Sequence, residues 1–180
     1  ENIQKESGFT QYDFMEKILF KQSDKISHTL NLQYSNSTDI PRYDRLTDVD
    51  ANGVFKTAEW YYGPQERMMA SYNLNIKSES KVFSEANIIL AYQGIEESRH
   101  SRNWNSSKLT HRTENVTVYS LNADFIKKSG KHDLSYGLEF THNDVKPAAE
   151  AENIKTGEIS TASTRYPDGG STMQTAAIYI

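Results

Sequence analysis

The stretch that decides the fold is Ser27-His28-Thr29-Leu30-Asn31-Leu32-Gln33-Tyr34-Ser35. In it, apolar or aromatic side chains alternate with polar ones, and a β-strand places alternating positions on opposite faces. The pattern therefore predicts a strand with one apolar and one polar face. The same pattern recurs along the chain, so the expected long strands cover residues 10–22, 27–35, 68–77, 85–93, 119–125, 133–140 and 173–180.

The connections between these strands differ in length. Short polar turns are expected at 23–25, 78–80 and 128–130, whereas long polar loops are expected at 36–65, 94–113 and 143–171. Short and long connections that alternate between amphipathic strands are typical of an outer-membrane β-barrel, whose long loops are extracellular. We therefore expect an all-β fold over residues 1–180, an antiparallel up-and-down meander of about seven long strands.

The composition excludes several classes of function. The chain has 180 residues with 20 basic and 24 acidic side chains, and this net charge of -4 disfavours nucleic-acid binding. It has no cysteine, so disulfides, thiolate metal sites and cysteine nucleophiles are excluded. No nucleophile elbow or Gly-rich phosphate loop is present, and we expect no enzyme activity.

An odd number of strands leaves a barrel incomplete. An open sheet has two unpaired edges, and unpaired backbone groups are not tolerated in lipid. We therefore interpret the chain as a segment of a larger barrel, in which further strands cover the edges. An isolated segment would cover them by self-association.

Two motifs in the first long loop carry a family resemblance. Residues 39–47 read Asp-Ile-Pro-Arg-Tyr-Asp-Arg-Leu-Thr, and residues 58–67 read Ala-Glu-Trp-Tyr-Tyr-Gly-Pro-Gln-Glu-Arg. Together they resemble the TonB-dependent outer-membrane receptors, and within them the haem and haemoglobin receptor group. The resemblance implies a 22-stranded barrel in the Gram-negative outer membrane, closed by an N-terminal plug domain. This chain would supply about a third of such a barrel and no plug domain.

The same resemblance implies a function. Receptors of this family import a scarce ligand with energy passed from the inner-membrane TonB complex, which would act through the plug domain. The expected ligand is haem or a haem-protein iron source, and the expected surroundings are outer-membrane lipid. The chain lacks the family's downstream Phe-Arg-Ala-Pro and Asn-Pro-Asn-Leu motifs. A receptor for a siderophore, cobalamin or another chelate therefore stays open, as does a soluble β-barrel ligand-binding module.

Candidate ligand-binding residues come from the loops. They are aromatic, charged or histidine side chains at expected loop positions: Arg42, Tyr43, Asp44, Arg45, Trp60, Tyr61, Tyr62, His100 and His111. Other interpretations stay open, because aromatic rings also anchor barrels at the membrane interface and charged residues also form salt bridges at a loop base. Surface histidines need no ligand either.

One stretch of the first loop has the spacing of a calcium-binding loop. Asp48, Asp50 and Asn52 precede Gly53, and Glu59 occupies the twelfth position. Both flanks read as strand or loop instead of the helices of an EF-hand. The stretch is therefore either a calcium site in an extracellular loop or a set of residues that favour turns. We expect no other intrinsic cofactor.

Overall fold

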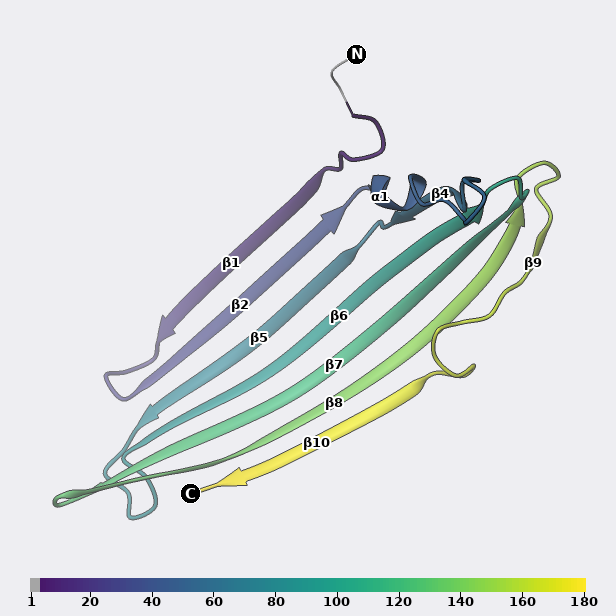
Figure 1. The fold of residues 1–180 in the computed structure, drawn as a ribbon. Helices are drawn as coiled ribbons and strands as arrows, with labels where there is room; N and C mark the ends of the chain where they lie inside the picture. Colours follow the sequence, from purple (N-terminus) through teal and green to yellow (C-terminus); the bar gives the residue numbers. More distant parts are fainter. Residues whose placement is uncertain (1–3) are drawn as a thin grey trace.

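A computed structural model describes residues 4–180; of the segment 1–180 expected from the sequence, residues 1–3 lie outside the described residues. The fold is all-β, and its long strands form one antiparallel meander (Figure 1). In sheet order these strands are β1 (Gln11–Lys21), β2 (Ile26–Ser37), β5 (Glu66–Lys77), β6 (Glu85–Asn103), β7 (Lys108–Ser129), β8 (His132–Asn153) and β10 (Ser171–Tyr179). The prediction of an up-and-down meander of seven long strands is confirmed.

The sheet is not closed within residues 4–180. Strand β1 pairs only with β2, and β10 pairs only with β8, so these two strands are the edges of the sheet. Figure 1 shows them on opposite sides of a curved, single-layer sheet. Each of these two strands therefore has one hydrogen-bonded neighbour among the described residues.

The strand register places the apolar residues in rows on one face, which we call the apolar face. One row crosses the sheet through Ile18, Leu30, Tyr72, Leu90, Leu121, Phe140 and Ala176. The adjacent row on the other face, which we call the polar face, runs through Lys17, Asn31, Ser71, Ala91, Ser120, Thr141 and Thr175. The alternation in the sequence thus corresponds to two distinct surfaces.

The apolar face carries a continuous belt that no other element within residues 4–180 covers. On β2 it extends from Ile26 to Tyr34, and the next residue of the same phase is Asn36. Its side chains are far from buried, since Leu90 is 51% and Tyr119 is 53% exposed. Among residues 4–180 the buried apolar side chains are few: Ala86, Leu109, Ala123 and Ala151. A belt of this extent is larger than the scattered apolar residues of an ordinary soluble surface.

Two of the expected long loops are largely strand. Strands β6 and β7 continue to Asn103 and from Lys108, so the region 94–113 contains only a tight turn around Trp104. Strand β8 continues to Asn153, so the loop expected at 143–171 shrinks to 154–170, which includes β9 (Ile159–Thr161). The prediction was wrong there because these extensions carry polar side chains on both faces, with only scattered apolar residues such as Ile95, Val116 and Val145. The hydropathy no longer alternates, although the backbone ladder continues.

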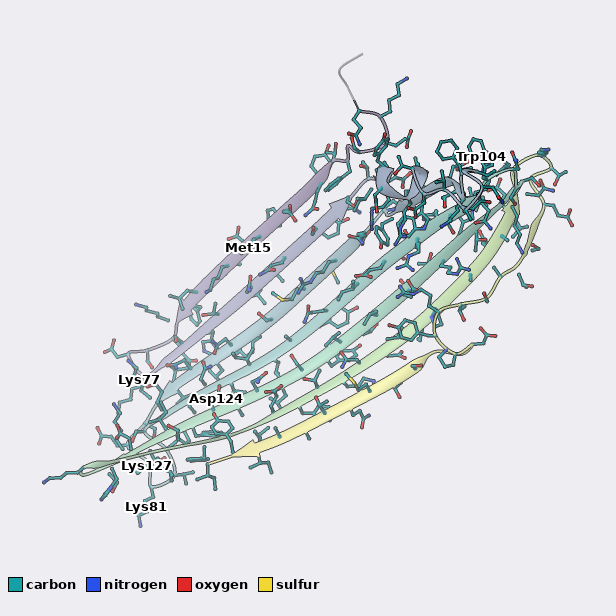
Figure 2. The ribbon with its side chains drawn as sticks, in the orientation of Figure 1. Met15, Lys77, Lys81, Trp104, Asp124 and Lys127 are labelled. Carbon is teal, nitrogen blue, oxygen red and sulfur yellow. The ribbon has the colours of Figure 1, made fainter. Side chains whose placement is uncertain are left out.

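The region 36–65 is the remaining long connection. It contains β3 (Ile40–Pro41), the helix α1 (Tyr43–Leu46) and β4 (Thr57–Tyr62). Strand β4 pairs with β3 and with the extension of β6. Figure 2 shows Trp104 at this end of the sheet, and Lys77, Lys81 and Lys127 at the opposite end, where the connections are short. Among the described residues, no helix is long and apolar enough to cross a membrane.

Candidate functional site

Strand β4 distributes the aromatic motif residues over both faces of the sheet. Its register pairs Tyr62 with Arg99 and Tyr61 with His100 on β6. Positions 99 and 101 of β6 have the phase of the polar face, and position 100 has the phase of the apolar face. Trp60 and Tyr62 therefore lie on the polar side and Tyr61 on the other. The three rings therefore do not form a single aromatic girdle.

On the polar side, three arginine side chains lie close to two aromatic rings. We call Arg42, Arg45, Trp60, Tyr62 and Arg99 the arginine–aromatic cluster. The rings of Trp60 and Tyr62 meet edge to face with centroids 4.5 Å apart. The guanidinium of Arg99 lies 5.5 Å from the Trp60 ring centroid and 5.3 Å from that of Tyr62. Arg42 lies 5.4 Å and Arg45 5.8 Å from the Trp60 centroid. Each distance is within the range of cation–π attraction.

The cluster has more positive than negative charge. Arg42 donates to both oxygens of Asp44, with Nε–Oδ1 and Nη2–Oδ2 distances of 2.7 and 2.6 Å. This bond lowers the pKa of the Asp44 carboxyl and raises that of Arg42. Arg45 is half exposed and reaches Asp48 only at 3.7 Å. Arg99 has a buried Nε with no hydrogen-bond partner among the described residues. The arrangement suits an anionic, flat partner.

On the other side, two histidines meet directly, and we call them the histidine pair. His100 Nδ1 lies 2.6 Å from His111 Nδ1, and His100 Nε2 lies 3.0 Å from the Gly63 carbonyl oxygen. The outer nitrogen of His111 faces Glu152 at 3.6 Å. The Tyr61 ring stacks on His100 with centroids 4.5 Å apart. The pair thus connects β4, β6, β7 and β8.

The histidine pair predicts a pH dependence of stability. Burial lowers the pKa of His100 from its ordinary 6.5, and the neighbouring His111 lowers it further, while the Gly63 carbonyl and Asp39 act in the opposite direction. The unfolded chain therefore binds more protons than the folded chain once the pH falls below about 6.5. We expect the free energy of unfolding to decrease from pH 7 towards pH 5. His100→Gln should flatten this decrease in denaturant titrations, and an unchanged slope would contradict the assignment.

The calcium-like stretch forms a turn. The Asp50 carboxylate accepts the backbone N–H groups of Asn52 and Val54 at 2.8 and 3.0 Å, and these bonds lower its pKa. Glu59 instead pairs with Arg102, whose Nε lies 2.7 Å from Glu59 Oε1. Within residues 4–180 no group of three or more His, Asp or Glu side chains is placed to hold a metal ion. The geometry favours turn formation, the alternative to calcium that the sequence left open.

The candidate residues therefore belong to separate groups. Arg42, Arg45, Trp60 and Tyr62 come together on the polar side, and Tyr61, His100 and His111 come together on the other side. Tyr43 is exposed on α1. Sequence reasoning missed Arg99, Gly63 and Glu152. Gly63 lies within the second loop motif but was not singled out there. No local pattern identifies Arg99 or Glu152, because only the strand register brings them to the site.

Comparisons with known proteins found no matching family model, no matching curated protein and no matching solved structure.

Proposed function

We propose that the chain forms part of the wall of a TonB-dependent receptor in a Gram-negative outer membrane. The observation that carries this proposal is the apolar belt, which crosses all seven long strands in register. On β2 the belt covers the nine residues from Ile26 to Tyr34, and a transmembrane β-strand needs about 9–11. Further strands of a 22-stranded barrel would pair with the free edges of β1 and β10.

The polar face would then line the lumen. It carries Asn, Ser and Thr side chains in the rows that back the belt, as expected for a hydrated interior. The side-chain oxygens of Asn31 and Asn73 are buried there without a hydrogen-bond partner among the described residues. Buried polar atoms normally have a partner, so water or a plug domain in the lumen would supply the missing donors.

The arginine–aromatic cluster is the proposed ligand contact. It lies on the lumen side beyond the belt, where a ligand entering from outside would pass. Haem has a flat apolar ring and two carboxylates, and the cluster offers aromatic faces together with Arg45 and Arg99. We therefore propose haem or a haem protein as the ligand, with another anionic iron chelate as the competing candidate.

A fluorescence experiment tests the membrane-wall proposal. In a background with Trp60→Phe and Trp104→Phe, Leu90→Trp would place the only tryptophan on the apolar face, and the control Ala91→Trp would place it on the polar face. In vesicles whose lipids carry bromine in the acyl chains, we expect strong quenching at position 90 and weak quenching at 91. Equal quenching at both positions, or none, would refute the proposal and favour a soluble module.

A haem titration followed by Soret absorbance tests the ligand. Arg45→Gln removes an exposed charge with only weak ion pairs, and we expect it to weaken haem binding by about tenfold. Tyr61→Phe, on the other side of the sheet, should leave haem binding unchanged. If the chain binds a ferric siderophore or cobalamin but not haem, the proposed ligand is wrong, and the proposal of a TonB-dependent receptor stands.

A further inference from the structure

The histidine pair brings together two ring nitrogens from neighbouring strands. A carbonyl oxygen only accepts, so the Nε2 of His100 must carry the hydrogen that lies towards Gly63. A neutral His100 then has a lone pair on Nδ1. This lone pair points at the Nδ1 of His111, only 2.6 Å away.

The outer nitrogen of His111 faces the Glu152 carboxylate at 3.6 Å, which is longer than a hydrogen bond. Without a bound cation, a neutral His111 that carries its hydrogen on Nδ1 donates it to the Nδ1 of His100. With that hydrogen on Nε2 instead, towards Glu152, both inner nitrogens present lone pairs to one point between them, which is the arrangement that a metal ion requires.

We propose that the histidine pair is a binding site for a divalent transition-metal ion such as Zn²⁺ or Cu²⁺, held by the Nδ1 atoms of His100 and His111. Neutral imidazole suits these metals. Histidines that ligate metals usually donate their other ring N–H to a carbonyl or a carboxylate. Gly63 and Glu152 occupy those two positions, one for each histidine.

The geometry requires only a small adjustment. Two Zn–N bonds of about 2.05 Å at a tetrahedral angle place the nitrogens roughly 3.3 Å apart. The side chains would therefore separate by less than about 1 Å from their present distance. Water would complete the coordination, since among residues 4–180 no group of three or more His, Asp or Glu side chains is placed to hold a metal ion.

Metal binding would compete with protons for the two Nδ1 atoms. In the neutral pair the ion takes the place of the hydrogen between these atoms, and that hydrogen moves to the Nε2 of His111, whereas in acidic solution the ion must displace a proton. Affinity should therefore fall by up to about tenfold per pH unit once the solution is acidic enough to protonate the pair. The acidic side chains around the pair are Asp39, Glu59 and Glu152, which favour a bound cation.

The experiment adds Zn²⁺ and Cu²⁺ to the chain in mild detergent. We expect Zn²⁺ to raise the Tm by several degrees, and Cu²⁺ to bind more tightly and to show nitrogen hyperfine splitting from two imidazoles in its electron paramagnetic resonance spectrum. Mg²⁺ and Ca²⁺ should have no effect. Glu152→Gln should weaken binding by about 10–100-fold without abolishing it.

Matched variants decide the outcome. His100→Gln and His111→Gln should each abolish the Tm shift and the two-nitrogen spectrum, while His132→Gln, at the opposite end of the sheet, should change neither. Circular dichroism without metal shows whether each variant folds. A wild-type chain that binds no metal, or one whose binding survives in both pair variants, would overturn the proposal. The hydrogen bond between the two imidazoles would then be the only role of the pair. Haem binding, measured separately, would be unaffected by this result.

Discussion

Leu121→Arg is expected to disturb membrane insertion more than any other single substitution on the sheet. Leu121 is central in the apolar belt, between Leu90 on β6 and Phe140 on β8. An arginine on the lipid face at the bilayer midplane costs about 2–4 kcal/mol. If the belt faces lipid, the folded fraction in vesicles should fall accordingly when it is measured by denaturant titration in lipid.

The adjacent position gives the control. Asn122 lies on the polar face, between Ile89 and Glu139. Asn122→Arg places the same charge in a hydrated lumen, and the Glu139 carboxylate is its direct neighbour across the strands. We expect a change of less than about 1 kcal/mol. Similar losses in the two variants would show that the faces are assigned incorrectly.

Gly63→Ala is the second substitution with a large expected effect. Gly63 has φ near +91°, and a Cβ atom there would meet the Thr38 carbonyl oxygen at 2.8 Å. The added methyl group would thus face both backbone strain and a clash with backbone, at a combined cost of about 2 kcal/mol or more. The substitution should also disturb the histidine pair, because the Gly63 carbonyl holds His100.

Gly53→Ala separates the two contributions. Gly53 also has positive φ, near +78°, but a Cβ atom there would meet nothing within 4 Å. We expect it to cost only the conformational strain of about 1–2 kcal/mol. Measured free energies of unfolding should therefore rank the variants with Gly63→Ala clearly less stable. Equal free energies of unfolding for the two variants would mean that the backbone around Thr38 moves to make room for the added methyl group.

The strands could be predicted from the sequence wherever the belt lies. Leu30 and Leu121 each lie between polar neighbours, whereas Leu90 lies between Ile89 and Ala91. The structure nevertheless places all three leucines in one row. The extension of β6 beyond Gly94 could not be predicted in this way. Glu96 and Glu97 are both polar although they face opposite sides, so hydropathy carries no information about the strand there.

The site was predicted only as a set of residue types. The motif identified Arg42 and Trp60, but alternation could not show that Tyr61 and Tyr62 point to opposite sides, because strand β4 lies in a region expected to be loop. Arg99 was missed for the same reason. Its contact with Trp60 depends on the pairing of β4 with β6, which is a long-range choice of register.

The extensions of β6, β7 and β8 have a mechanical consequence. About ten residues of β6 continue past the belt at roughly 3.3 Å each, which is about 30 Å of continuous ladder along the strand. If the belt spans the outer membrane as proposed, this ladder would project beyond the lipid, by less than its full length because barrel strands are tilted. Groups attached to such a ladder keep a fixed height and orientation while flexible loops move around them. A ligand captured there would order few side chains on arrival, and less of the contact energy would be lost to immobilisation.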